Sequence, residues 1–271
     1  MKRITLSMLA LAVTAGGFLT LTHFMTNGDG QPERVTQAAP DEAVTQVTAS
    51  EIDAAPDSIA NGDTEGRIEL AQADLNAVEA AGFIEGRHYR RLSPTQPSGS
   101  SSDQVEVAEF FMYSCIHCYN LEPYVQAWLE NKPEHIDFVR VPTTWSAGVR
   151  MHAQAFYAAE ALGKGEEMHQ PFFREMHVSG NFLETPDAMA GFFGRFDVNR
   201  DDFESVFDSF AVHTKVNRAD ELGRRYRVDS TPTIVINGKY TTGTGMADPT
   251  GGSPERLFEL IEVLAAAELG Q

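Results

Sequence analysis

The chain has 271 residues, with 21 Lys or Arg against 39 Asp or Glu, which gives a formal net charge of −18 at pH 7. So acidic a surface repels phosphate backbones. This excludes nucleic-acid binding by charge, and it argues against a polybasic membrane-surface role or acidic substrates. Hydrophobic residues make up 42% of the chain, enough for the core of one or two domains at about 150 residues each. The only two Cys lie three positions apart, which excludes a scaffold of several disulfides.

The N-terminus is expected to be a targeting segment. Lys2 and Arg3 precede Ile4–Met25, a run without Asp, Glu, Lys or Arg. This run is longer than the core of a usual signal peptide and long enough to cross a bilayer, so residues 1–27 are expected to be a signal peptide or a membrane anchor. Both readings place the rest of the chain across the membrane. A buried core helix is the third reading, although no partner helix follows.

The next segments carry few large apolar side chains. Residues 28–66 are rich in Ala, Thr, Asp, Glu, Gly and Pro and are expected to form a flexible acidic linker. Arg67–Ala81 has apolar residues at near-helical spacing, which predicts a short helix that stops at Gly82. With the Ser- and Pro-rich stretch Ser93–Asp103, this helix forms a lead-in segment over residues 67–103.

From Gln104 onward the pattern predicts strands and helices of a mixed domain. Val105–Met112 is β-branched and aromatic, which is typical of a strand. Cys115–Glu130 has an apolar stripe at helical spacing and predicts a helix. His135–Val141 alternates between apolar and polar residues and predicts a second strand.

The stretch Met151–Arg227 has no strand-like run and holds four or five amphipathic segments, which predicts a block of helices. Its Phe residues at helical spacing are expected to form the core of this block: Phe172, Phe173, Phe192, Phe193, Phe196, Phe203, Phe207 and Phe210. Its His residues are expected to be partly exposed: His152, His169, His177 and His213.

The pattern of the C-terminal part predicts a hairpin followed by a helix. Thr233–Asn237 is an apolar strand, and Asn237-Gly238 is a strong signal for a tight hairpin turn. Ser253 and Pro254 are typical of the cap and the first position of a last helix.

The motif Cys115-Ile116-His117-Cys118 follows a predicted strand and opens a predicted helix. A thiol at a helix N-terminus faces unpaired N–H groups and the positive end of the dipole, which favour the thiolate. A protonated His117 adds a nearby cation and a donor. Cys115, at the exposed start, is expected to be the nucleophile and Cys118 the resolving thiol. Because a stabilised thiolate stabilises the reduced form, the pair is expected to donate disulfides.

Other readings of this motif stay open at this point. A structural disulfide in so short a loop removes little chain entropy. A zinc or copper site needs further ligands, which His117, His169 and His177 could supply, but neither a second Cys pair nor an H-x-x-x-H spacing is present. Chance placement at a strand-to-helix junction is the third alternative.

A second motif, Ser230-Thr231-Pro232-Thr233, directly precedes the apolar strand. Pro at the start of a strand cannot donate to the ladder. A cis bond before Pro232 would turn the chain sharply and present the Thr231 backbone to a substrate, and this is the conformation we expect. The alternative is an ordinary trans entry into the strand.

These residues resemble a known family. From about Gly82 to Gln271 the chain is similar to the DsbA family of secreted disulfide oxidoreductases. The matching motifs are Glu85-Gly86-x-x-Tyr89-x-x-Leu92, Glu109-Phe110-Phe111, Cys115-Ile116-His117-Cys118-Tyr119 and Thr231-Pro232-Thr233. The resemblance implies an α/β thioredoxin fold with an inserted all-helical domain. Its first half would span residues 104–150, the insert 151–227 and its second half 228–271.

The resemblance also implies roles for single residues. Glu109 matches an acid that helps to move the proton of the resolving Cys, and its apolar neighbours are expected to raise its pKa. An edge-strand Glu that faces water is the alternative. The family usually has Pro-His between the cysteines, whereas this chain has Ile116-His117, which puts oxidising strength and partner choice in question. Ile116, Thr231 and Pro232 are expected to contact the substrate.

The expected function is that of a periplasmic thiol:disulfide oxidoreductase, secreted or tethered by its N-terminal segment, that oxidises reduced Cys pairs of exported proteins. The resemblance implies no cofactor beyond the Cys115–Cys118 disulfide, reoxidation by a DsbB-type quinone-linked membrane oxidase, and action as a monomer. A reductase or isomerase of the same fold is the first alternative. A chaperone-like or metal-carrying binding module and a purely structural domain are the others.

Overall fold

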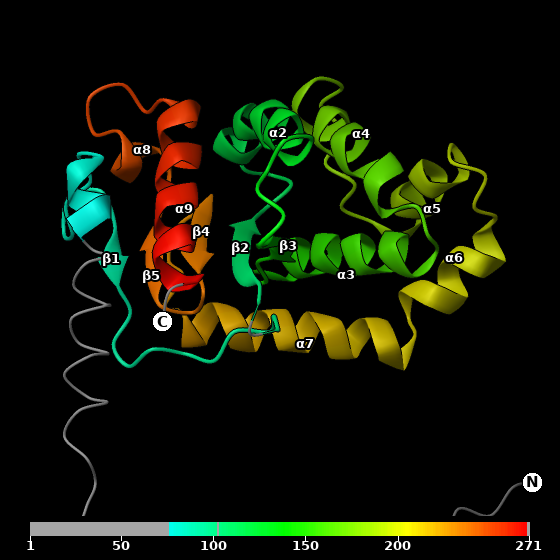
Figure 1. Ribbon diagram of the computed structural model, residues 1–271. Helices are drawn as coiled ribbons and strands as arrows, with labels where there is room; N and C mark the ends of the chain where they lie inside the picture. The colour runs from blue at the N-terminus through cyan, green and yellow to red at the C-terminus, as the bar shows by residue number, and fades with distance from the viewer. Residues whose placement is uncertain (1–75, 102, 270–271) are drawn as a thin grey trace, which may run out of the picture. The chain divides into compact units, whose positions relative to one another are not determined.

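The computed structural model describes residues 76–101 and 103–269, and the structural statements below concern these residues. The targeting segment, the acidic linker and most of the helix predicted at Arg67–Ala81 lie outside them, while residues 76–80 are helical. Within the described ranges, no helix is long and apolar enough to span a bilayer. Figure 1 shows the elements in chain order: β1 (Arg90–Arg91), β2 (Val105–Phe111), α2 (Ile116–Leu129), β3 (Ile136–Pro142), α3 (Ala147–Ala161), α4 (Gly165–His177), α5 (Pro186–Gly194), α6 (Arg200–Phe207), α7 (Phe210–Arg225), β4 (Thr233–Ile236), β5 (Tyr240–Thr242), α8 (Thr244–Ala247) and α9 (Pro254–Leu269).

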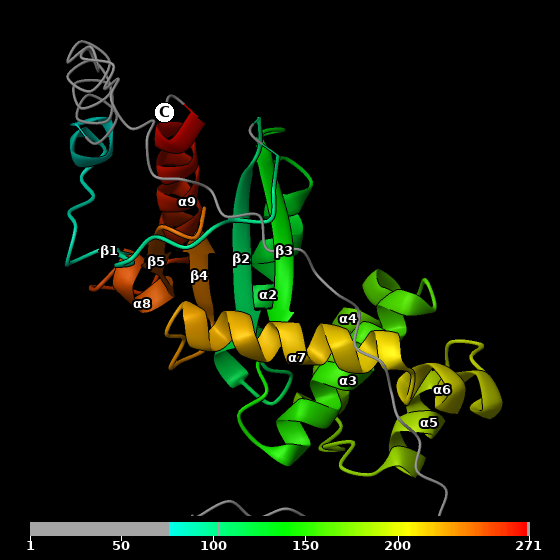
Figure 2. The same ribbon diagram turned by 90° about the horizontal axis from the view of Figure 1, so that it is seen from below.

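The strands form one mixed sheet in the order β1-β5-β4-β2-β3. β2 pairs in parallel with β3 and antiparallel with β4, so β2 is an inner strand. Alternate residues of β2 point to opposite faces: Val107 packs in a cluster with α2 and α9, and Ala108 in a cluster with α7. The sheet is therefore covered on both faces, with α7 crossing one and α2 and α9 on the other (Figure 2). This confirms the predicted α/β thioredoxin fold.

The predicted C-terminal hairpin and helix cap are confirmed. Asn237 and Gly238 have φ values of 50° and 59°, as the central residues of a type I′ turn require, and the Lys239 N–H bonds the Ile236 carbonyl oxygen at 2.9 Å. A Cβ on Gly238 would collide with the carbonyl oxygen of Gln96, so this position accepts only glycine. The Ser253 hydroxyl accepts a hydrogen bond from the Arg256 N–H at 3.3 Å and caps α9.

Between β3 and β4 the chain forms only helices, α3 to α7, as the lack of strand-like runs predicts. Phe196 is partly buried. Six of the other predicted core Phe residues are buried: Phe172, Phe173, Phe192, Phe193, Phe203 and Phe207. The prediction for Phe210 is wrong, because this side chain is 86% exposed. It stands at the first position of α7, outside the stripe of Val212, Val216 and Ala219 that α7 buries.

The His residues of this block also differ from expectation. His152 and His169 are only 5% and 2% exposed, so the prediction of partial exposure is wrong for both. Each has polar neighbours inside the core, which makes burial of an imidazole tolerable: His152 bonds the Phe182 carbonyl oxygen at 2.9 Å. His177 is half-buried and His213 exposed.

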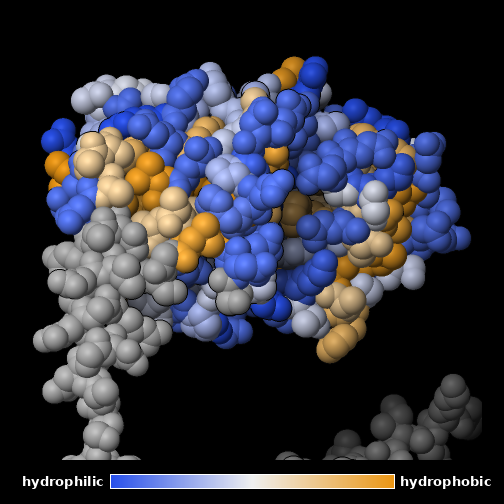
Figure 3. Space-filling view, in the orientation of Figure 1, coloured by the Kyte–Doolittle hydropathy of each residue, from blue (hydrophilic) through white to orange (hydrophobic). Residues whose placement is uncertain are grey.

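The face of the molecule that Figure 3 shows is mainly hydrophilic, with hydrophobic side chains in separate patches.

The contrast between two Phe residues gives a stability prediction. Phe193→Ala removes a ring that is 0% exposed, and we expect it to lower the free energy of unfolding by about 3–5 kcal/mol. Phe210→Ala removes an exposed ring and should change that free energy by less than about 0.5 kcal/mol. Urea unfolding followed by circular dichroism measures both. Equal losses in the two variants would contradict the assignment of the helical core.

Candidate active site

The two cysteines lie at the start of α2, directly beyond the end of β2. Cys115 is the N-cap, with an extended backbone, and its Sγ accepts the N–H of Cys118 at 3.4 Å. Cys118 lies one turn into the helix and is 1% exposed, whereas Cys115 retains 8% exposure. An attacking or attacked sulfur must be reachable, so the geometry favours Cys115 for the reaction with a partner and Cys118 for the shielded role.

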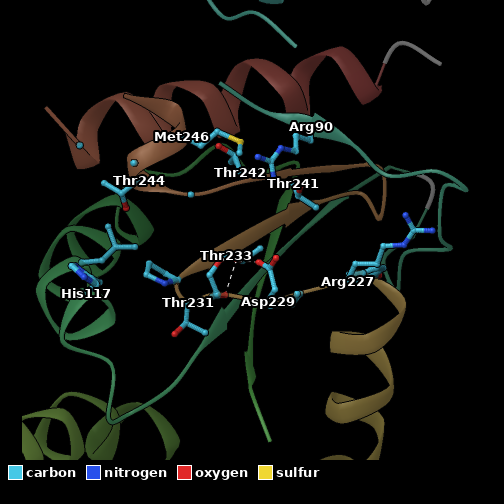
Figure 4. Close-up of a pocket in the computed structure, with 18 of the residues that line it drawn as sticks. Arg90, His117, Arg227, Asp229, Thr231, Thr233, Thr241, Thr242, Thr244 and Met246 are labelled. Atoms are coloured by element: carbon cyan, nitrogen blue, oxygen red, sulfur yellow. Dashed lines mark hydrogen bonds between the residues drawn. The ribbon is translucent and has the colours of Figure 1, made fainter. Parts of the chain in front are cut away.

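The Thr231–Pro232 peptide bond is cis, so the ordinary trans strand entry does not occur. Its loop lies against the cysteines, with the Thr231 carbonyl oxygen 3.3 Å from the Sγ of Cys115. The Thr233 hydroxyl donates to the Ser230 carbonyl oxygen at 2.8 Å and ties the loop together, as the dashed line in Figure 4 shows. Ile116 is 48% exposed beside Cys115. The structure thus brings the predicted substrate-contact residues close to Cys115, the more accessible of the two cysteines.

The two thiols have opposite electrostatic environments. Hydrogen bonds, first from the Cys118 thiol and then from the Thr231 side chain and the N–H groups of Cys118 and His117, outweigh partial burial and lower the pKa of Cys115 to about 5. Burial, followed by the neighbouring Cys115, raises the pKa of Cys118 far above its usual value. At neutral pH the reduced pair therefore holds one thiolate, at Cys115, and one thiol, at Cys118.

The role of the His117 imidazole as a cation and a donor stays a prediction. Its side chain is exposed and lines the groove next to α2. In the described part of the chain, its ring forms no hydrogen bond with either sulfur, and it is the backbone N–H of His117 that favours the Cys115 thiolate. The N–H groups at the helix start therefore add to the larger contributions of the Cys118 thiol and of Thr231.

Glu109 is buried on the inner strand β2, with 2% exposure, so an edge-strand Glu facing water is excluded. Burial, reinforced by the negative charge of Glu122 and opposed by Arg140, raises its pKa to about 8. Its Oε2 lies 3.9 Å from the Nε of Arg140, too far for a hydrogen bond. A carboxyl in this state is protonated at neutral pH and can give up a proton.

Glu109 has buried partners that the sequence pattern alone did not reveal. Glu122 lies four residues after Cys118 on α2 and is 2% exposed. Its Oε1 is 3.0 Å from Arg140, and its Oε2 is 3.3 Å from the Nε2 of His169. Although burial alone would raise the pKa of Glu122, the contact with His169 and the charge of Arg140 lower it. The i+4 spacing from Cys118 was the available signal, since it places Glu122 under the active site.

A groove of about 1070 Å³ opens beside the cysteines. His117 and Tyr124 of α2, the loop around Pro232, and Arg90 of β1 contribute to its walls (Figure 4). A cavity of this size accepts several residues of a peptide or a drug-sized ligand. Within residues 76–101 and 103–269, no group of three or more His, Cys, Asp or Glu side chains is placed to hold a metal ion.

Comparison with known proteins agrees with this geometry. A family model described as a DSBA-like thioredoxin domain matches residues 106–250. The thiol:disulfide interchange proteins DsbA of Burkholderia cepacia and Pseudomonas aeruginosa are each 34% identical, over 70% and 73% of this chain and 90% and 93% of their own. The crystal structure of Pseudomonas aeruginosa DsbA has 33% identity and a TM-score of 0.65, covering 70% of this chain and 96% of its own. That of Xylella fastidiosa DsbA has 27% identity and a TM-score of 0.62, covering 69% and 97%. The chain combines this similarity with a Cys115–Cys118 pair at a helix start, opposite a cis-proline loop. The protein therefore belongs to the DsbA family of thiol:disulfide oxidoreductases.

Proposed function

We propose that the protein donates disulfide bonds, and that Cys115 is the residue through which every exchange passes. The observation that carries this direction is the lowered pKa of Cys115, about 5, beside a Cys118 whose pKa is raised. Stabilising the Cys115 thiolate stabilises the reduced form of the protein, so the oxidised form gives its disulfide away more readily.

In the proposed reaction, a substrate thiolate attacks the Sγ of Cys115 in the Cys115–Cys118 disulfide. A bond forms between the substrate and Cys115, and Cys118 leaves as a thiolate, which takes a proton from the carboxyl of Glu109. A second substrate thiolate then attacks the substrate sulfur of the mixed disulfide and releases Cys115 as a thiolate. The substrate loses two electrons and gains a disulfide, and the protein is reduced by two electrons.

The size of the effect follows from the pKa of Cys115. At pH 7 a thiol with a pKa of about 5 instead of its usual 9.0 gains about 2.7 kcal/mol from ionisation, at about 1.36 kcal/mol per pH unit. For a two-electron couple this equals about 60 mV of additional oxidising potential. Thr231 and Pro232 would hold an extended substrate strand beside Cys115, and Ile116 would offer an apolar contact.

Equilibration with glutathione redox buffers tests the direction of the reaction. Alkylation of free thiols and mass spectrometry give the oxidised fraction at each ratio of reduced to oxidised glutathione. We expect a reduction potential above about −200 mV, more oxidising than the glutathione pool. A potential near the thioredoxin value of about −270 mV would instead assign the protein to the reductases.

The likeness to proteins named thiol:disulfide interchange protein DsbA supports a further part of the proposal. The substrates would be exported proteins with reduced Cys pairs, and the place of action the periplasm. A DsbB-type quinone-linked membrane oxidase would reoxidise Cys115 and Cys118, and no cofactor would be needed beyond their disulfide. The cysteines, the cis-proline loop and Glu109 all belong to one chain, which supports action as a monomer.

A further inference from the structure

The charge of the groove beside the active site is opposite to that of the whole chain. Among the residues that the structure describes, the charged side chains that line the groove are Arg90, Arg91, Arg227 and Asp229, three cations against one anion, in a chain with a net charge of −18. The overall charge, which argues against acidic substrates, therefore does not describe this surface.

Two of these cations are available to a ligand. Arg91 forms an ion pair with Glu85 at 3.3 Å and lies over the ring of Tyr240. Arg90 and Arg227 are exposed, and neither forms an ion pair with any residue that the structure describes. A carboxylate is a strong partner for an unpaired guanidinium, because two N–H groups can donate to its two oxygens.

The position of Arg227 adds a second argument. The N–H of Val228 bonds the Gly223 carbonyl oxygen at 2.9 Å, and the N–H of Arg227 bonds that of Arg224 at 3.1 Å, which together form a Schellman motif at the end of α7. Arg227 occupies the left-handed position of this motif, with φ 54°, where glycine is preferred. The chain thus places a long cationic side chain at the groove at a cost in backbone conformation.

Strand register gives the distance between Arg90 and the reacting sulfur. Arg90 lies opposite Thr241, which lies opposite Val235, so the three share one face of the sheet. Val235 is four residues beyond Thr231, the residue beside Cys115. Two strand spacings and four residues, of which only the last part belongs to β4, separate the Cα atoms of Arg90 and Thr231 by at most about 16 Å, or about five residues of extended chain.

We propose that this groove binds an acidic segment of the substrate. The Glu or Asp side chains of this segment would lie about three to five residues from the substrate cysteine that exchanges with Cys115. The inference rests on the proposed disulfide donation and adds its substrate preference. Hydroxyls of Thr231, Thr241 and Thr244 at the groove supply further donors for carboxylates. The repulsion from the remaining acidic surface is screened beyond about 8 Å at physiological ionic strength, so contacts within the groove decide the preference.

Three thiol peptides test this inference on the oxidised full chain. They share one sequence with a central Cys and carry Glu, Gln or Lys at positions three to five on both sides of it. Rates of reduction of the Cys115–Cys118 disulfide are measured by quenching and alkylation at 0.15 M and 0.5 M salt. The variant Arg90→Gln/Arg227→Gln removes the two available cations. Arg200→Gln/Lys215→Gln, which changes two exposed cations of α6 and α7 outside the groove, is the matched control.

We expect the Glu peptide to react about threefold to tenfold faster than the Lys peptide at 0.15 M salt, as two exposed ion pairs would give. This ratio should fall toward one in Arg90→Gln/Arg227→Gln and at 0.5 M salt, and stay unchanged in Arg200→Gln/Lys215→Gln. Equal rates for the Glu and Lys peptides, or a ratio that the groove variant leaves unchanged, would overturn the preference. Failure of all three peptides to reduce the disulfide would instead overturn the disulfide donation itself.

Discussion

Cys118→Ala is expected to convert the protein from a disulfide donor into a trap for its partners. The variant loses the hydrogen bond from the Cys118 thiol that lowers the pKa of Cys115 most, but it keeps the stabilising backbone N–H groups at the helix start. It has no second thiol to resolve a mixed disulfide. Its complexes with disulfide-bonded partners should therefore accumulate instead of turning over. Non-reducing gels and mass spectrometry of the adducts measure this, together with a complete loss of disulfide donation to a reduced, unfolded protein.

Cys115→Ala is the matched control for this trap. It should lose disulfide donation as completely as Cys118→Ala, and it should form no adducts, because the remaining Cys118 is 1% exposed and its pKa is raised. If Cys118 captured partners as well as Cys115 does, the assignment of the two roles would be wrong. If both variants kept the wild-type activity, the pair would be structural.

Glu109→Gln is expected to slow disulfide donation at pH 7 by about 10²-fold, because the amide cannot give Cys118 a proton as it leaves. The variant should also be more stable at high pH. In the unfolded chain Glu109 ionises near 4.5, whereas its folded pKa is about 8. The native state therefore holds one proton more between these values and loses stability as pH rises from about 4.5 to 8.

The size of this stability effect is bounded by the shift in pKa. A difference of 3.5 units, from 4.5 to about 8, corresponds to a gain in stability of at most about 5 kcal/mol at high pH. Thermal unfolding of both proteins at pH 4, 6 and 8 should show curves that are close at pH 4 and separate as pH rises. A constant difference at all three values would contradict a buried, neutral carboxyl.

Local pattern was enough to predict most of the fold. The strands at Val105 and Thr233, the helix after Cys115 and the Asn237-Gly238 turn each follow from a short-range rule, and all are present. The two-residue strand β1 was not predicted, because two residues carry no periodic pattern and only pairing with β5 makes them a strand. Phe210 was misplaced because helical spacing alone does not show on which side of a helix end a ring will fall.

The candidate site was predictable where its residues are close in sequence. Cys115 and Cys118 were found from their spacing and from the strand-to-helix junction. The ion-pair network of Glu122, Arg140 and His169 comes from three separate elements, and only the fold brings those side chains together. The same is true of Arg90 and Arg227, whose proximity to one groove depends on the pairing of β1 with β5 and on the end of α7.

The proposed direction of disulfide transfer depends on the ionisation of the Cys115 sulfur. The reduced protein is titrated from pH 3 to pH 10 while the ultraviolet absorbance of the thiolate is recorded, with Cys115→Ala as the reference. We predict a single transition near pH 5 that is absent from Cys115→Ala. A transition near the ordinary thiol value of 9.0 would mean that the active site does not hold Cys115 as an anion, and the proposed direction of disulfide transfer would be wrong.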